Sequence, residues 1–420
     1  MRARSLLVLA ATLGAAACQS DAIPSATPAM TEPVQEELLT LVTAPPLNSV
    51  QQRRLSVVRE RGSSAQVNVA RVQAAPAQRL NRKSALRFQV APGISVVADG
   101  ENFVQRAPGD VSWSGAVRGG VGRVQLVMVD GAVTGTITVD RTTWSVAPLG
   151  DGLHSVTRID QNGLPPEHAP DNPSGALRDD FGGALQARVP AGGGTVGALA
   201  NTTINVAVVY TASVLAAAPN IASLIQLAVD ETNQSYVNSG INITFNRVYT
   251  GPVTYNEASR SFTQHTNALA LTADGLMDNV HTLRNTYAAD VVLLVVNDSE
   301  ACGQAAAINA TATSAFAVAD YTCITGYYSF GHEIGHLQGA RHDRYVDAST
   351  SPYSYGHGFI PASKTWRTVM SYGNNCSNCT RIQYWSNPLK TYGGVAMGTA
   401  LYEDNARVLN LTAPTVAAFR

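Results

Sequence analysis

The chain has 420 residues, of which 45% are hydrophobic and 14% charged, and its formal net charge is −1. This composition supplies a sizeable core and excludes the disordered and fibrous classes. The sequence has no basic run of the kind that binds nucleic acid. The length predicts two or three domains, or one large domain with an appendage, and the low charge fraction is typical of a secreted protein.

The N-terminus predicts an export signal. Two arginines precede an apolar stretch from Leu6 to Ala17, which is too short for a membrane span because a span needs about 20 apolar residues. We expect residues 1–17 to be cleaved as a signal peptide. A small residue before Cys18 resembles a bacterial lipobox with Cys18 lipidated, although Ala15 stands where leucine is usual. The alternative is an ordinary secretory signal, and no later segment predicts a membrane span.

The rest of the N-terminal half predicts a small antiparallel β domain between two irregular segments. Residues 19 to about 55 are rich in Pro, Ala, Thr and Glu and are expected to form a tether. Residues 161 to about 199 are rich in Pro and Gly and are expected to form an exposed linker. The expected strands between them are Leu86–Val90, Ile94–Val97, Val124–Asp130, Val133–Asp140 and Trp144–Pro148.

After residue 201 the pattern changes to alternating strands and helices. The order strand–helix–strand–helix–strand predicts an α/β sandwich around a mostly parallel sheet. The expected strands are Ile204–Tyr210, Ile241–Tyr249, the apolar Val291–Val296 and a short edge strand at Gly303–Ile308. The expected helices are Ile221–Val237 and Leu276–Tyr287.

Four of the five cysteines lie in the last third of the chain. In an oxidising compartment we expect two disulfides, and of the three possible pairings we favour Cys302–Cys323 and Cys376–Cys379. The alternative for Cys376-x-x-Cys379 is a zinc site. That site would need a second C-x-x-C pair, which the sequence lacks.

The segment H-E-I-G-H-L-Q-G-A-R-H-D, which begins at His332, predicts a catalytic zinc site. His336 lies four residues later, so the two imidazoles leave the same face of a helix. Gly339 can adopt a left-handed conformation that ends the helix and returns the chain, so that His342 supplies a third ligand. Glu333 stands beside them as a general base. Three protein ligands and one open position are the arrangement of a single catalytic zinc ion.

This segment resembles the motif of the metzincin metallopeptidases, H-E-x-x-H-x-x-G-x-x-H followed by a methionine-containing turn. Met370 lies in such a turn, Thr368–Gly373. The resemblance implies an α/β (α+β) catalytic domain with a twisted mixed sheet and an active-site helix, and it makes Met370 the apolar floor beneath the metal. It also implies that Tyr372 binds the metal or the tetrahedral intermediate.

The sequence is most similar to the bacterial peptidyl-Asp metalloendopeptidases. The similarity covers most of residues 201–420 and rests on Asp343, on the M-S-Y turn, and on Tyr384–Pro388, Asp404–Arg407 and Ala417–Arg420. It implies that protein and peptide substrates are hydrolysed on the N-terminal side of Asp. The alternatives are a broad-specificity metzincin and a non-catalytic zinc-binding lipoprotein.

Selectivity for Asp needs a cation that faces the residue after the cut. Arg381 is the first candidate, because a guanidinium pairs bidentately with a carboxylate, and Arg367 and Lys364 are the next. The expected edge strand at Gly303–Ile308 would hold the substrate backbone by strand addition.

The N-terminal half resembles the pro-region of a zymogen. We expect residues 18–199 to be a propeptide that inhibits the catalytic domain, residues 200–420. Its removal would release a secreted bacterial enzyme, whether or not the precursor is a lipoprotein. Inhibition by a cysteine is disfavoured because Cys18 is the only cysteine in this half. His154 and His168 could reach the metal, but their spacing does not indicate it. Arg178-Asp179-Asp180 offers a self-cleavage site, and His265, His281 and His357 are interpreted as surface or core groups.

Overall fold

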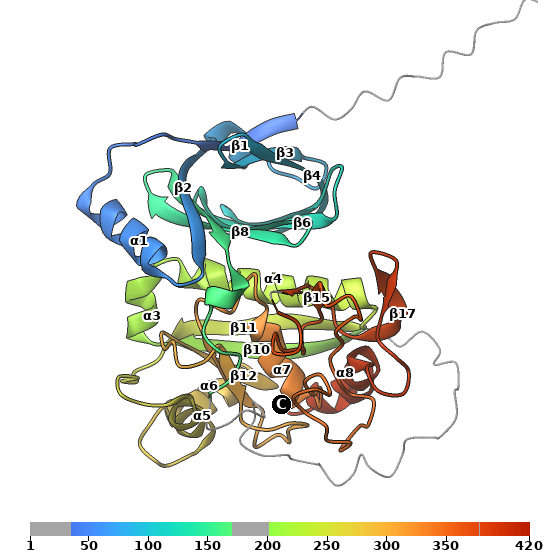
Figure 1. The fold of residues 1–420 in the computed structure, drawn as a ribbon. Coiled ribbons are helices and arrows are strands. Elements are labelled where there is room, and N and C mark those ends of the chain that lie inside the picture. The colour runs from blue at the N-terminus through green and yellow to red at the C-terminus, as the bar shows by residue number, and fades with distance from the viewer. Residues whose placement is uncertain (1–34, 170–200, 378) are drawn as a thin grey trace, which may run out of the picture. The chain divides into compact units, whose positions relative to one another are not determined.

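The computed structural model describes residues 35–169, 201–377 and 379–420 (Figure 1). The predictions for the signal peptide, for Cys18 and for cleavage at Arg178-Asp179-Asp180 fall on residues outside these ranges. Within the described ranges, no helix is long and apolar enough to cross a membrane.

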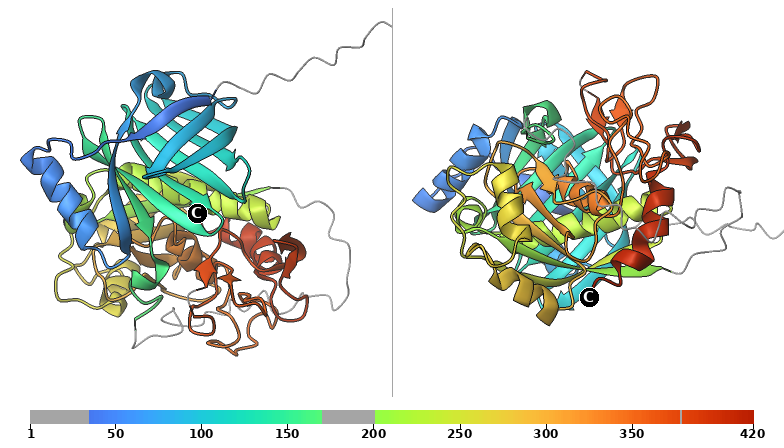
Figure 2. Two further views of the ribbon diagram at one scale, coloured as in Figure 1. Left: turned by 45° about the horizontal axis from the view of Figure 1, so that its top comes forward. Right: turned by 90° about the horizontal axis from the view of Figure 1, so that it is seen from below.

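The first half of the chain forms a closed barrel of nine strands, blue to green in Figures 1 and 2. Neighbouring strands are antiparallel except β1 and β3, which pair in parallel and close the barrel. Around the barrel the strands follow the order β1(Gln35–Leu41), β2(Ser64–Val72), β9(Leu153–Ile159), β8(Thr142–Gly150), β7(Ala132–Val139), β6(Gly122–Val129), β5(Asp110–Val117), β4(Ile94–Ala107) and β3(Ala85–Ala91). Two helices accompany them, α1(Ser49–Glu60) and α2(Ala74–Gln78).

The expected tether is wrong for residues 35–55, which contain strand β1 and the first turns of helix α1. Leu38 and Leu39 of β1 are buried in the barrel core. Helix α1 begins after Asn48, whose side chain accepts hydrogen bonds from the amides of Val50 and Gln51 in a capping box. The average composition of this segment did not indicate the strand or the helix cap. A strand needs only a few buried positions, and its pairing partners are distant in sequence.

The second half of the chain is a mixed α/β unit, which confirms the predicted class. Its sheet order is β11-β10-β12-β14-β13, with every neighbouring pair parallel except β13 and β14. The strands are β10(Thr202–Tyr210), β11(Ile243–Pro252), β12(Val291–Val296), β13(Gly303–Ala305) and β14(Phe316–Asp320). The helices are α3(Ala212–Ala217), α4(Ile221–Ser239), α5(Phe262–Ala270), α6(Asn279–Thr286), α7(Ser329–Leu337) and α8(Asn405–Val416). Two short strand pairs, β15(Trp366–Arg367) with β16(Thr380–Arg381) and β17(Asn387–Tyr392) with β18(Val395–Met397), complete the unit.

Alternation along the strands divides the core of this unit into two layers. Val206, Val208 and Leu293 face α4, α7 and α8 in one hydrophobic cluster. Ala207 and Leu294 face α5 and α6 in another, on the other side of the sheet (Figure 1). Helix α7, which carries His332 and His336, is therefore held against one face of the sheet, close to the edge strand β13.

The expected exposed linker is wrong for residues 161–169. A short 3-10 helix, Gln161–Gly163, is followed by a segment in which His168 and Ala169 are buried. The backbone amide of Cys302 donates to the carbonyl of Pro166 over 2.7 Å. The segment is therefore held by hydrogen bonds to the chain at the start of β13, which its Pro-rich composition did not indicate.

Polar contacts connect the barrel to helix α4. The hydroxyl of Thr136 on β7 donates to Glu231 over 2.6 Å, and the amide of Asn220 donates to the hydroxyl of Thr134 over 2.8 Å. Glu231 also accepts from the backbone amide of Gly326 over 2.9 Å. Burial raises the pKa of the Glu231 carboxyl to about 8, and the charge of Asp230 acts in the same direction.

We predict that this carboxyl makes the stability of the full chain depend on pH. Because its pKa is raised in the folded chain, its stabilising contribution is complete below the usual pKa of 4.5 and is lost as pH rises to about 8. The loss is at most about 1.4 kcal/mol per pH unit within that window. Thermal unfolding of the full chain should show a Tm that falls faster from pH 5 to 8 than in the same chain with Glu231→Gln. Parallel pH profiles would contradict this assignment.

Candidate active site

Helix α7 and the turn after it bring the three predicted histidine ligands together. All nine residues of α7 are buried, and His332 and His336 lie one turn apart on it. Gly339 has a φ of +96°, a left-handed conformation that a side chain would strain, and it reverses the chain toward His342. The Nε2 atoms of His332 and His336 lie 3.2 Å and 2.9 Å from Nε2 of His342.

A fourth histidine, His168, completes this group. Its Nε2 atom lies 2.9 Å from Nε2 of His342 and 3.3 Å from Nε2 of His332. The four ligand atoms lie within 4.8 Å of one another, and all four side chains are buried. We refer to His168, His332, His336 and His342 as the histidine cluster. The sequence placed His168 in a linker, and no spacing relative to the other three could have identified it.

Backbone carbonyls fix the orientation of three of these rings. Nδ1 of His332 lies 2.9 Å from the carbonyl of Val369, and Nδ1 of His336 lies 2.9 Å from that of Ala340. Nδ1 of His168 lies 2.8 Å from the carbonyl of Gly303. Because a carbonyl can only accept, these Nδ1 atoms carry the proton and the converging Nε2 atoms keep their lone pairs.

Burial keeps the histidine cluster neutral. It lowers the pKa of His168 to about 4 and holds the pKa values of the other three well below 6.5. Four lone pairs that point at one buried position repel one another unless a cation lies between them. The donor set therefore fits a metal ion that prefers imidazole nitrogen.

Glu333 lies beside the histidine cluster and is buried. Burial raises the pKa of its carboxyl well above 4.5, against the opposing charge of Arg381. Its Oε1 atom lies 4.0 Å from Nδ1 of His168, and Oε2 has no hydrogen-bond partner among the described residues. A Cβ atom on Gly303 would lie 2.3 Å from Oε1, so the carboxylate can approach β13 only because this residue is glycine.

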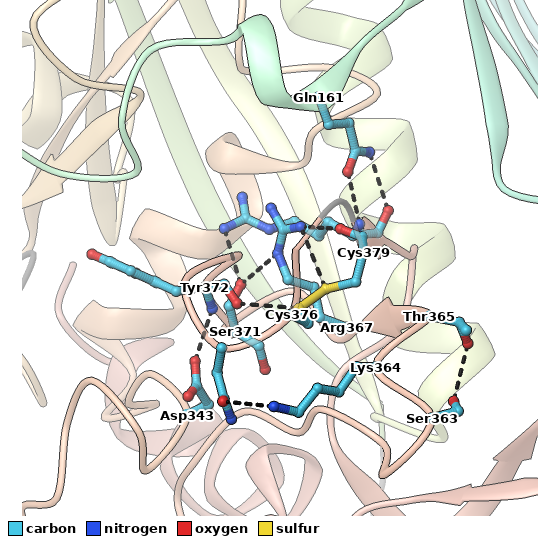
Figure 3. Close-up of a disulfide and its surroundings, with 12 residues drawn as sticks. Gln161, Asp343, Ser363, Lys364, Thr365, Arg367, Ser371, Tyr372, Cys376 and Cys379 are labelled. Atoms are coloured by element: carbon cyan, nitrogen blue, oxygen red, sulfur yellow. Dashed lines mark hydrogen bonds between the residues drawn. A yellow bond between two sulfur atoms is a disulfide. The ribbon is translucent and has the colours of Figure 1, made fainter.

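The methionine turn packs beneath α7. Met370 is fully buried, and its sulfur borders Gly335, between the two histidines of the helix. The ring centroid of Tyr372 lies 4.5 Å from that of His342. The backbone amide of Tyr372 donates to Asp343 over 2.8 Å (Figure 3), which connects the turn to the residue after the third histidine.

Both predicted cysteine pairs are joined as disulfides, Cys302–Cys323 and Cys376–Cys379. The zinc alternative at Cys376 and Cys379 is therefore wrong, because a disulfide offers no thiolate. The second disulfide closes a short loop whose Cys379 carbonyl accepts from Arg367 (Figure 3).

The three candidate cations lie in different environments. Arg381 and Arg367 are buried and share one carboxylate, that of Glu167. Lys364 is exposed and donates to Asn375 over 3.1 Å (Figure 3). Although burial disfavours the ionised form of Glu167, the charges of Arg381 and Arg367 hold its pKa below 4.5. The two arginines therefore form a site for an ionised carboxylate.

The comparisons with known proteins agree with this geometry. A family model described as "Metallo-peptidase family M12" matches residues 200–386. The peptidyl-Asp metalloendopeptidase of Xanthomonas campestris pv. campestris is 45% identical over 297 residues, which are 70% of this chain and 69% of that protein. The one of Stenotrophomonas maltophilia is 45% identical over 304 residues, 70% of each chain.

The chain belongs to the peptidyl-Asp metalloendopeptidase family. The prediction of a metalloendopeptidase is thereby confirmed, and M12 metallopeptidases depend on a metal ion. Among solved structures, metalloproteinase-II from Bacteroides fragilis covers 63% of this chain and 83% of its own, with 12% identity and a TM-score of 0.41. The family assignment rests on the two sequence relatives.

We predict that Gly303→Ala disables this metalloendopeptidase without removing its metal. The new Cβ atom would displace the Glu333 carboxylate, and loss of the general base that the sequence predicts at Glu333 would lower kcat by about 100-fold or more. Leu389→Ala is the control, because Leu389 lies on β17 in the same unit and is 89% exposed. An unchanged kcat in Gly303→Ala, with metal content measured on the same sample, would contradict the placement of Glu333.

Proposed function

We propose that this protein is a secreted bacterial zinc endopeptidase, made as a zymogen, that hydrolyses peptide bonds on the N-terminal side of aspartate. The observation that carries the proposal is the juxtaposition of the histidine cluster and Glu333 with two buried arginines that bind a carboxylate. The names of the relatives support the same substrate preference.

Zinc is the metal we assign to His332, His336 and His342, since three imidazoles with one further position are typical of catalytic zinc. When bound, zinc would supply Lewis acidity that makes water a nucleophile at neutral pH and polarises the scissile carbonyl. The carbonyls of Val369 and Ala340 hold the first two rings in the ligating tautomer.

The chain's own groups would move the protons. The Glu333 carboxylate takes the proton of the attacking water and delivers it to the leaving amine. The Tyr372 hydroxyl, whose ring lies beside His342, donates to the oxygen of the scissile carbonyl as negative charge develops on it. Met370 supports α7 from below, and the edge strand β13 binds the substrate backbone.

The pocket for the substrate aspartate would be formed by Arg381 and Arg367. Nη1 of Arg381 donates to the carbonyl of Tyr327 over 3.1 Å, and the guanidinium lies 4.1 Å from the centroid of the Tyr327 ring. Nε of Arg367 donates to the carbonyl of Ser371 over 3.0 Å. These contacts fix both guanidinium groups before a substrate binds, which lowers the entropy cost of recognising a carboxylate.

The N-terminal half would be the pro-region of this enzyme. Residues 1–17 would be the signal peptide, 18–199 the propeptide and 200–420 the catalytic unit. Cleavage at Arg178-Asp179-Asp180 would match the proposed specificity, and it would also separate the enzyme from a lipid on Cys18.

A peptide library tests the proposed activity directly. After activation we expect cuts before Asp and almost none before Asn, and a zinc chelator should abolish them all. Mixed cleavage sites would favour a broad-specificity protease, and no cleavage at all would favour a non-catalytic zinc protein.

Arg381→Ala tests the pocket. Loss of a hydrogen-bonded charge pair of this kind costs about 1.5–3 kcal/mol, so kcat/KM for an Asp peptide should fall about 10- to 100-fold relative to a matched Asn peptide. Zinc content should be unchanged, and the exposed Lys364→Ala serves as the control. An Asp-to-Asn preference that survives in Arg381→Ala would remove this residue from the pocket.

A further inference from the structure

The segment that leads out of the barrel is hydrogen-bonded to the chain at the start of the edge strand β13. The amide of Cys302 donates to the Pro166 carbonyl over 2.7 Å, and the amide of Gly303 donates to the Glu167 carbonyl over 3.2 Å. These amides lie at the edge of the sheet, at the start of β13. Pro165–His168 therefore uses backbone groups that an extended peptide substrate would need.

The Glu167 side chain fills the arginine site. Both guanidinium groups, of Arg381 and Arg367, contact its carboxylate, and the hydroxyl of Tyr327 donates to it over 2.5 Å. Its side chain is 9% exposed. Charge-assisted hydrogen bonds of this kind are the stronger ones in proteins, so the pocket is occupied by a side chain of the chemical class that it would select.

The His168 side chain is the fourth member of the histidine cluster. Its ring has the same arrangement as those of His332 and His336, with Nδ1 held by a backbone carbonyl and Nε2 turned toward the other ligand atoms. A fourth imidazole would close the coordination sphere of a metal ion held by the other three, and a closed tetrahedral site would leave no position for water or substrate.

We propose that Glu167 and His168 together form a plug that keeps the zymogen latent. Glu167 occupies the pocket formed by Arg381 and Arg367, and His168 occupies the fourth coordination position of the metal ion. This inference rests on the proposed function, because it uses the same metal site and the same pocket. Glu167 also identifies Arg367, Arg381 and Tyr327 as the residues that would recognise the substrate's acidic side chain.

The direction of the chain explains why the plug is not itself a substrate. In a substrate cut before Asp, the residue at the metal precedes the residue in the pocket. Here the residue at the metal, His168, follows the residue in the pocket, Glu167. The segment therefore runs through the two subsites in the opposite direction and presents an imidazole, not a scissile carbonyl, to the metal.

Covalent attachment to the catalytic unit holds the plug at a high effective concentration. One cut between residues 169 and 201 would make its binding bimolecular. The barrel and the plug could then dissociate together, because the 3-10 helix Gln161–Gly163 and the plug follow β9 directly.

The first test counts metal ligands in the intact chain, so it does not depend on activity. Zinc-edge X-ray absorption of full-length Glu333→Ala should show four imidazole ligands. Adding His168→Ala should give three imidazoles and one oxygen ligand, whereas adding His281→Ala, on α6, should leave four. Three imidazoles in the parent chain, or four after His168→Ala, would overturn the proposal.

The second test measures latency in the chain that retains Glu333. His168→Ala and Glu167→Gln should each shorten the lag before self-processing by about 10-fold or more, and the exposed Glu60→Gln should not change it.

A peptide of residues 163–170 should inhibit the activated enzyme in competition with an Asp peptide, and the same peptide with Gln for Glu167 should inhibit about 10-fold less. Unchanged lags and no inhibition, in an enzyme that does cut before Asp, would refute the plug alone. An absence of all proteolysis would refute the proposed function, and the ligand count would still decide on His168.

Discussion

Four neutral imidazoles that turn their lone pairs toward one buried position determine much of the rest of the structure. The arrangement is electrostatically unfavourable without a cation, so it indicates a metal site even from the protein atoms alone. Three of the imidazole rings are held in this orientation by a backbone carbonyl that accepts from Nδ1. The carbonyls are those of Val369, Ala340 and Gly303. The methionine turn, the helix α7 with its C-terminal turn, and the edge strand β13 are thus coupled through the metal site.

The second constraint is that buried charges need partners. Arg381 and Arg367 are buried, and a carboxylate between them offsets the cost of their burial. In the zymogen that carboxylate would be Glu167, and in the active enzyme it would be the substrate aspartate. The same requirement would thus stabilise the latent form and select the substrate of the active one.

Local sequence patterns predicted the parts of the site that lie close together along the chain. The spacing of His332, His336 and His342 was sufficient because a helix and one glycine turn determine their geometry. The strand Val291–Val296 was recognisable because a buried parallel strand is apolar throughout.

The parts that depend on distant contacts could not be predicted. His168 lies 164 residues from His332, and nothing in its neighbourhood marks it as a member of the histidine cluster. The parallel pairing of β1 with β3 closes the barrel through another such contact. For Arg381 the chemistry of an acidic substrate suggested the residue, but only the fold places it beside Arg367 on one carboxylate.

The most direct measurement is anomalous X-ray scattering at the zinc edge from crystals of the zinc-loaded, full-length Glu333→Ala chain. We expect one strong peak bounded by Nε2 of His168, His332, His336 and His342, at about 2.0–2.1 Å from each. A zinc ion held by His332, His336 and His342 alone, with solvent in the fourth position, would contradict the role of His168. A peak elsewhere in the chain would contradict the metal site itself.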